Sequence, residues 1–147
     1  MTEEAVTKAI LQWLEETGWQ ILDYDFPGGG TGRKFHLTSD ASDKTRGIII
    51  PDIIAHRETR LLVLENKSVD TLSDYDKIKY LAGSPDFKTQ LLQAYPELDI
   101  EQITLGIGYG GAPRHLPHAA SSHIDVILGV SDKVSDMPVC QVIFGKL

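Results

Sequence analysis

Apolar residues recur along this chain with two different spacings, and each spacing predicts one kind of secondary structure. Near the start they lie three to four positions apart, so one face of a helix over residues 2–17 is apolar. The stripe on this face consists of Val6, Ile10, Trp13 and Leu14. Thr2 or Thr7 is suited to cap the first turn, and Gly18 is expected to end the helix.

Alternating or short apolar runs predict strands in the rest of the chain. We expect them at residues 19–26, in two segments within 48–68, at 103–109 and at 139–146. Helical spacing returns over residues 72–95, as one helix broken near Gly83 or as two helices, whereas 119–131 fits neither type clearly. The glycine-rich polar stretch 27–47 predicts a long loop. The order of elements is α-β-β-β-α-β with a tail, which favours an α/β fold with a mixed sheet.

Composition narrows the class of protein. The length of 147 residues predicts a single domain over 1–147, and the apolar runs are too short to span a bilayer, so we expect no membrane association. The acidic, amphipathic N-terminus is not typical of a secretory signal or transit peptide. The single cysteine, Cys140, cannot form an internal disulfide, which favours a cytoplasmic location. A net charge of −7 argues against non-specific binding to polyanions, but it is compatible with a nucleic-acid enzyme whose site is rich in carboxylates.

Three charged residues occupy positions where the hydrophobic pattern predicts a buried sheet. Asp52 lies inside the first apolar run of residues 48–68, and Glu65 and Lys67 end the second. Side chains alternate between faces along a strand, so Glu65 and Lys67 share one face. A two-residue turn at Glu58-Thr59 would pair position 57 with 60 and 54 with 63, and would place Asp52 opposite Glu65.

Two carboxylates that face each other repel unless a cation lies between them. Carboxylate and carbonyl oxygens are the ligands that Mg²⁺ prefers, and Lys67, one pleat away, is a second partner. The alternative is that these residues are solvated ion pairs at strand ends, where charged side chains are common. An aspartate after Pro51 within an apolar run, followed at hairpin distance by Glu-x-Lys, favours a functional site over that alternative.

Pro51-Asp52, followed after a hairpin by Glu65-Asn66-Lys67, resembles the motif of the PD-(D/E)XK nuclease superfamily. This superfamily includes type II restriction endonucleases, Holliday-junction resolvases and DNA-repair nucleases. The expected elements over residues 2–110 are similar in order to its core. The resemblance implies a restriction-endonuclease-like α-β-β-β-α-β core, with a central mixed sheet flanked by helices, and Mg²⁺-dependent hydrolysis of DNA in which Mn²⁺ can substitute.

The same resemblance implies roles for individual residues. Asp52, Glu65 and the main-chain carbonyl of Asn66 would hold the metal, and Asp52, Glu65 and Lys67 would be catalytic. Many members of the superfamily also carry a glutamate on the first helix, for which Glu4 is our choice and Glu3 the rival.

The resemblance also directs attention to basic residues that could contact DNA. The candidates are Arg33, Lys34, His36, Lys44 and Arg46 in or beside the long loop, and Lys77 on the helix after the motif. Cutting both strands of a duplex normally takes two active sites, so we expect a homodimer with the long loop or the segment from about residue 124 near the interface. The partners expected are therefore DNA and a second copy, with no small-molecule organic cofactor.

Other patterns carry less weight. The glycines of Gly106–Gly111 formally match a dinucleotide-binding fingerprint, but prolines follow where a helix should begin, so a strand close to another backbone is the better interpretation. His115, His118 and His123 are interpreted as loop histidines. Two other classes remain open, namely a non-catalytic nucleic-acid-binding or assembly module and a nucleotide-using enzyme. Within the nuclease hypothesis, a restriction-type enzyme is favoured slightly over a DNA-repair or Holliday-junction-resolving nuclease.

Overall fold

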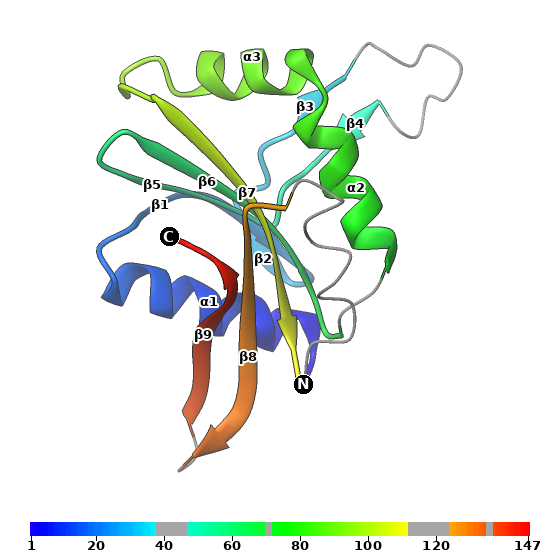
Figure 1. Cartoon of the computed structure of the whole chain (residues 1–147), viewed down its shortest axis with the longest axis vertical. Helices are drawn as coiled ribbons and strands as arrows, with labels where there is room; N and C mark the ends of the chain where they lie inside the picture. Colours follow the sequence, from blue (N-terminus) through cyan, green and yellow to red (C-terminus); the bar gives the residue numbers. More distant parts are fainter. Residues whose placement is uncertain (38–46, 70–71, 112–123, 135–136) are drawn as a thin grey trace.

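The chain folds into an α/β structure in which helices flank a mixed sheet of seven strands (Figure 1). The computed structural model describes residues 1–37, 47–69, 72–111, 124–134 and 137–147. The helices are α1 (Glu3–Glu16), α2 (Leu72–Ala82) and α3 (Pro85–Ala94). The strands of the large sheet are β1 (Gln20–Phe26), β2 (Gly29–Gly30), β5 (Ile53–Arg57), β6 (Arg60–Lys67), β7 (Gln102–Gly110), β8 (Val126–Val134) and β9 (Met137–Gly145). A separate small pair is formed by β3 (Phe35–His36) and β4 (Ile48–Ile49).

The strands of the large sheet follow the order β2-β1-β5-β6-β7-β8-β9. Antiparallel pairing joins β2, β1, β5 and β6, whereas β7 runs parallel to both β6 and β8, and β9 returns antiparallel to β8. With the short strands left out, the chain passes through α1, β1, β5, β6, the α2–α3 pair and β7. This is the predicted α-β-β-β-α-β order, and the predicted fold class is confirmed.

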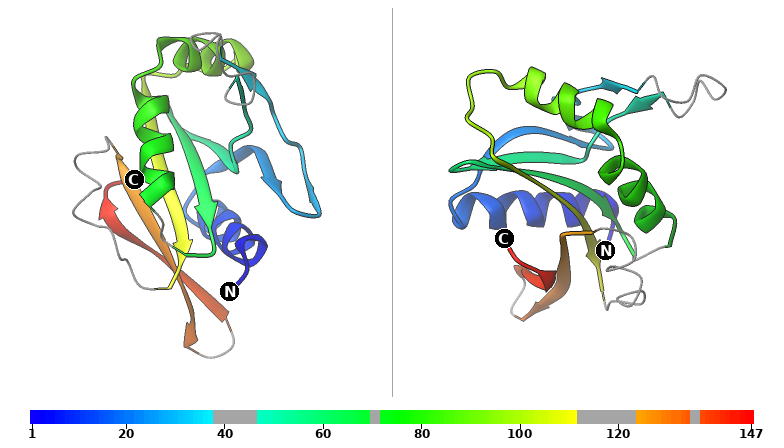
Figure 2. Two further views of the ribbon diagram at one scale, coloured as in Figure 1. Left: turned by 90° about the vertical axis from the view of Figure 1, so that its right-hand side faces the viewer. Right: turned by 45° about the horizontal axis from the view of Figure 1, so that its top comes forward.

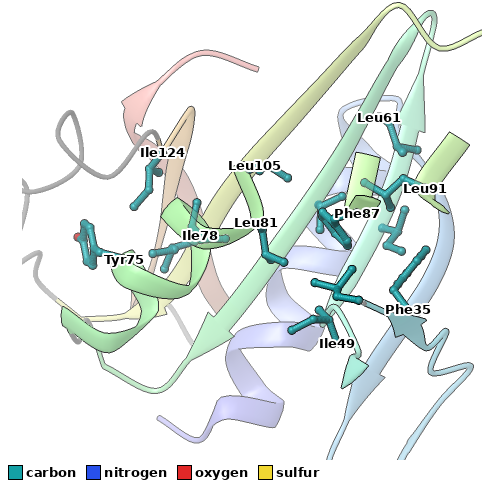
Figure 3. Packing of buried hydrophobic residues seen from close by; sticks show 14 of the residues in the cluster. Phe35, Ile49, Leu61, Tyr75, Ile78, Leu81, Phe87, Leu91, Leu105 and Ile124 are labelled. Atoms are coloured by element: carbon teal, nitrogen blue, oxygen red, sulfur yellow. The ribbon is translucent and has the colours of Figure 1, made fainter. Parts of the chain in front are cut away.

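The two faces of the sheet are covered by different helices, as the right-hand view of Figure 2 shows. Helix α1 lies on one face, where its stripe residues Val6, Ile10 and Leu14 are fully buried against strand residues such as Leu62 and Leu64. Helices α2 and α3 cover the other face. Figure 3 shows their buried residues packed with the alternate side chains of β6 and β7, and the residues labelled there include Ile78, Leu81, Phe87, Leu91, Leu61 and Leu105.

Local sequence signals set the boundaries of these helices. Helix α1 begins at a cap in which the Thr2 hydroxyl accepts a hydrogen bond from the backbone N–H of Ala5 at 3.1 Å. Ser84 caps α3 in the same way, accepting from the N–H of Phe87 at 3.2 Å, and Pro85 is the first residue of the helix. Residues 72–95 therefore contain two helices, which was one of the two predicted alternatives.

The structure corrects the sequence interpretation in one segment and completes it in another. The stretch 27–47 was predicted to be a loop, but its described part contains β2 and β3. Strand β2 forms because a turn pairs it with β1. Strand β3 is held in place by the apolar Phe35, which packs against Phe87 of α3. The ambiguous segment 119–131 contains the start of strand β8. Among the helices described, none is long and apolar enough to cross a bilayer.

Candidate active site

The β5–β6 hairpin brings Asp52 and Glu65 together at one end of the sheet. Its two-residue turn pairs Arg57 with Arg60 and Ile53 with Leu64, which is the register expected from the sequence. The backbone N–H of Asp52 donates to the carbonyl of Leu64 at 3.1 Å, which places the Asp52 and Glu65 carboxyl groups at the same end of the hairpin. The two groups are close enough for the negative charge of Asp52 to raise the pKa of Glu65. Two ionised carboxylates at this distance repel each other unless a proton or a cation relieves the repulsion.

Burial changes the acid–base behaviour of both carboxyl groups. Glu65 is only 3% exposed, and desolvation together with the negative charge of Asp52 raises its pKa to about 8, although Lys77 opposes the shift. Desolvation also raises the pKa of Asp52, and the charge of Glu3 acts in the same direction. The Asp52 carboxylate accepts a hydrogen bond from the backbone N–H of Asn66 at 2.6 Å, which opposes this shift.

Two lysines reach this end of the sheet from different elements. Lys77 extends from α2, and its Nζ lies 3.0 Å from Oε2 of Glu65. Lys67 ends β6, and its Nζ lies 3.8 Å from Oε2 of Glu3 at the start of α1. The side chain of Lys67 is 43% exposed, so it remains accessible to a substrate in solvent. The site therefore contains three acidic groups, Asp52, Glu65 and Glu3, and two basic groups, Lys67 and Lys77.

The first-helix glutamate that faces this cluster is Glu3, the rival in the sequence analysis. Glu4, our choice from the sequence, forms an ion pair with Lys8 on the same helix, with Nζ 2.7 Å from Oε1. Because consecutive helical residues point about 100° apart, only one of two neighbouring glutamates can reach the end of β6. Glu3 contacts Lys67 and influences the pKa of Asp52, whereas Glu4 is paired with Lys8.

Asn66 divides its interactions between the site and the core. Its backbone N–H donates a hydrogen bond to the carboxylate of Asp52. Its side chain points to the opposite face, where it is fully buried and its amide donates to the hydroxyl of Thr7 on α1 at 3.2 Å. The side chain therefore anchors the end of β6 to α1. The metal-ligand role of its main-chain carbonyl stays a prediction.

The donor groups of the site fit a hard divalent cation. The Oε1 atom of Glu65 is buried and has no hydrogen-bond partner, and a cation between Glu65 and Asp52 would relieve the repulsion of the two carboxylates. Within the described ranges, no group of three or more His, Cys, Asp or Glu residues is placed to hold a metal. The protein ligands at this end of the sheet would therefore be Asp52, Glu65 and a main-chain carbonyl, with water completing the shell, as is usual for Mg²⁺.

The predicted DNA-contacting residues are distributed over several environments. Lys34 and His36 are exposed, and the backbone of His36 is hydrogen-bonded to the side chain of Gln90 on α3. Arg33 forms an ion pair within the protein, with its Nε 2.9 Å from Oδ2 of Asp23, and its contact with DNA stays a prediction. Lys44 and Arg46 lie outside the described residues, as do His115, His118 and His123.

The ion pair of Arg33 belongs to a small polar cluster around Asp23 of β1. The Arg33 guanidinium stacks over the ring of Tyr95 at 5.0 Å, and the Tyr95 hydroxyl also donates to Asp23. Burial alone would raise the pKa of Asp23, but these hydrogen bonds outweigh it and hold the pKa below its usual value. The cluster ties β1 to the end of α3.

Asp25 is a further carboxylate at this end of the sheet that the sequence pattern did not single out. Strand β1 pairs with β5 through Tyr24 and Ile53, and the next backbone N–H, of Asp25, donates to the carbonyl of Asp52 at 2.9 Å. The alternation of Asp23, Tyr24 and Asp25 was visible in the sequence. That β1 lies beside β5 was not, because the pairing spans about thirty residues and includes a bulge between Ile21 and Asp23.

The glycines of the dinucleotide-like pattern lie within strand β7, except Gly111, which directly follows it. Gly106 has Val126 on one side and Leu64 on the other, and a Cβ atom built on it would lie 2.7 Å from the carbonyl oxygen of Val126. Gly110 would meet the carbonyl of Ser68 at 2.8 Å. The glycines therefore allow close packing in the middle of the sheet, as the preferred sequence interpretation expected.

Comparison with known proteins identifies no family. No protein-family model matches the chain, and no curated protein matches it. One similar solved structure is that of SfsA from Pyrococcus furiosus in complex with Ca²⁺, with a TM-score of 0.38 and 13% sequence identity. The similarity covers 97% of this chain but 61% of that one, so this chain spans less than two-thirds of the length of SfsA. At this level of similarity, the comparison carries no information about activity.

Proposed function

We propose that this protein is a metal-dependent deoxyribonuclease of the PD-(D/E)XK type that hydrolyses DNA phosphodiester bonds. The observation that supports this most strongly is the pairing of Asp52 with the buried Glu65, beside Lys67 at the end of one strand. A buried carboxyl pair is unfavourable for stability unless it is protonated or binds a cation, so its presence beside the partly exposed Lys67 favours a functional role.

In this proposal, each residue has a distinct task. Asp52, Glu65 and the carbonyl of Asn66 hold Mg²⁺ or Mn²⁺, which supplies positive charge next to the scissile phosphate. Lys67 orients the attacking water and neutralises the negative charge that develops as the bond between phosphorus and the leaving sugar oxygen breaks. Glu3 positions the Lys67 ammonium through their ion pair. The ion pair is long, which leaves donor hydrogens of Lys67 available for water and phosphate.

The substitution Lys67→Ala tests this assignment. Its side chain is partly exposed at a strand end, so we expect folding and DNA affinity to change little, because one cation is lost among several phosphate contacts. Cleavage of supercoiled plasmid DNA with Mg²⁺ or Mn²⁺ should fall by about a hundredfold or more, because the lost interaction is strongest in the transition state. Cutting and DNA binding are measured on the same preparations.

Lys88→Ala is the matched control, because Lys88 is an exposed lysine on α3. It should leave cleavage within a few-fold of the wild type. If Lys67→Ala also cuts within a few-fold of the wild type, Lys67 is not catalytic. DNA binding by the wild type without any cutting would instead indicate a non-catalytic nucleic-acid-binding module.

The same digests address the class of nuclease. We expect cut ends at defined sequences, as for a type II restriction endonuclease. The net charge of −7 limits non-specific DNA binding, and the long polar segment 27–47 offers side chains that could read bases. Cleavage confined to branched or damaged substrates would indicate a repair or junction-resolving enzyme.

A further inference from the structure

Lys77 forms an ion pair with Glu65, one of the two carboxyl groups proposed to bind the metal ion. It extends from α2, outside the Glu65-Asn66-Lys67 segment, and its Nζ lies 3.0 Å from Oε2 of Glu65. The other oxygen of Glu65, Oε1, is buried without a hydrogen-bond partner. One oxygen of the buried carboxylate is therefore occupied by an internal ammonium group, whereas the other is free.

Ionisation of both carboxyl groups leaves an excess of negative charge around Glu65. Lys67 is paired with Glu3, and Lys77 is the lysine that contacts Glu65. When both carboxyl groups are ionised, Asp52, Glu65 and Lys77 together carry a net charge of −1. A divalent cation would change it to +1, and a DNA phosphate beside the cation would return it to zero. The cation and the ammonium of Lys77 therefore repel each other until a phosphate is present.

Lys77 is also placed so that it can change partners. Its side chain is 38% exposed, whereas that of Glu65 is 4% exposed, so the lysine can move away from the pair while the carboxylate stays fixed in the sheet. A lysine is a flexible chain with a strongly hydrated ammonium group, and it forms good contacts with phosphate oxygens.

We propose that Lys77 is an internal counter-ion of Glu65 that competes with the divalent cation in the free protein and turns to a DNA phosphate when the cation binds. Cation binding and DNA binding are then coupled through one lysine, and the cation is held weakly until DNA arrives. This inference rests on the proposed nuclease function, but its test measures cation binding and not activity.

The test compares Mn²⁺ affinity, measured by titration calorimetry, in the wild type and in Lys77→Gln. Glutamine keeps a polar, unbranched side chain one atom shorter than that of lysine and removes the charge. The variant should bind Mn²⁺ more tightly in the absence of DNA, by about three- to tenfold, because a charged hydrogen bond no longer competes for Glu65. A short duplex with phosphorothioate linkages should increase Mn²⁺ affinity in both proteins, and by a larger factor in the wild type.

Two control variants separate this effect from a general change of charge or fold. Lys79→Gln removes an exposed lysine from the same helix and should leave Mn²⁺ affinity unchanged. Lys77→Arg retains the positive charge and should behave like the wild type. Thermal melting of each variant in chelator establishes that it is folded before the titrations.

Unchanged or weaker Mn²⁺ binding by Lys77→Gln would overturn the proposal, because the lysine would then be irrelevant or would help to form the site. An equal gain in Lys79→Gln would also overturn it, as would the absence of Mn²⁺ binding by every protein. Tighter Mn²⁺ binding by Lys77→Gln together with a wild type that cuts no DNA would support the counter-ion role and reject the nuclease function.

Discussion

Glu65 is an ionisable residue of the candidate site that is also buried in the core of the protein. It follows fully buried residues of β6, and its own side chain is nearly inaccessible to solvent. An ionised carboxylate in such a place lowers stability unless it is paired and hydrogen-bonded. Three factors reduce this penalty, namely the ammonium of Lys77, the protonated form that the raised pKa of Glu65 favours and, in the proposed function, a divalent cation.

The raised pKa of Glu65 predicts how the metal-free protein responds to pH. The ordinary value is 4.5, and burial with the charge of Asp52 raises it to about 8. Between these values, the folded protein holds a proton that the unfolded chain has lost. The free energy of unfolding should therefore fall as pH rises, by at most about 1.4 kcal/mol per pH unit. Glu65→Gln removes this contribution, so its melting temperature relative to the wild type should rise from about pH 5 to about pH 8.

Differential scanning calorimetry in chelator measures this difference. Glu15→Gln, at an exposed position on α1, is the control and should show no comparable trend. A difference between Glu65→Gln and the wild type that stays constant across this range, or changes in the opposite direction, would contradict the assignment of a raised pKa to Glu65.

At the level of elements, strand β7 has no space for a side chain at Gly106, where it packs between β6 and β8. Gly106→Ala would place a methyl group 2.7 Å from the backbone oxygen of Val126 and 2.9 Å from a methyl of Leu64. The backbone of β8 cannot move aside without disturbing its pairing with β7, so we expect the substitution to lower the free energy of unfolding by about 1–3 kcal/mol. Urea denaturation followed by circular dichroism measures this change.

Gly83→Ala is the matched control, because the atoms nearest to its added methyl group lie at 3.7 and 3.8 Å, which is ordinary van der Waals contact. A stability of Gly106→Ala equal to that of Gly83→Ala would show that β7 can adjust. In that case, close packing would not explain why this strand is rich in glycine.

The elements also show which parts of the structure follow from local sequence. The stripe of α1 and the register of the β5–β6 hairpin were predictable because both depend on residues close together in the chain. The two-residue turn at Glu58-Thr59 fixes which residues face each other, and so it predicted the proximity of Asp52 and Glu65.

Interactions between distant elements were not predictable in the same way. Whether Glu3 or Glu4 faces Lys67 depends on how α1 is rotated against the sheet, and sequence spacing does not determine this rotation. The contact of Lys77 with Glu65 likewise depends on where α2 packs, so the sequence placed Lys77 near the motif without identifying its partner. The position of Asp25 beside Asp52 requires the order of the strands, which local patterns do not contain.

At the scale of the whole molecule, the two edges of the large sheet differ. One edge is the very short β2, whereas the other is the nine-residue β9, whose single partner in the described sheet is β8. Val139 and Val142 on β9 are 43% and 39% exposed. Long, apolar edge strands tend to pair with another chain, and the proline of β9, Pro138, lies at the start of the strand. This edge belongs to the C-terminal segment that the sequence analysis placed near a dimer interface.

We therefore expect the wild type to form a homodimer through β9, with one active site directed at each strand of a duplex. Sedimentation velocity at tens of micromolar protein should detect this dimer. The double substitution Val139→Lys and Val142→Lys should yield a monomer, because charges on the edge disfavour strand pairing. Leu92→Lys, which replaces a similarly exposed apolar residue on α3, should remain dimeric. A wild type that sediments as a monomer both alone and with DNA would exclude this assembly, and the cutting of two strands would then require two successive encounters with the duplex.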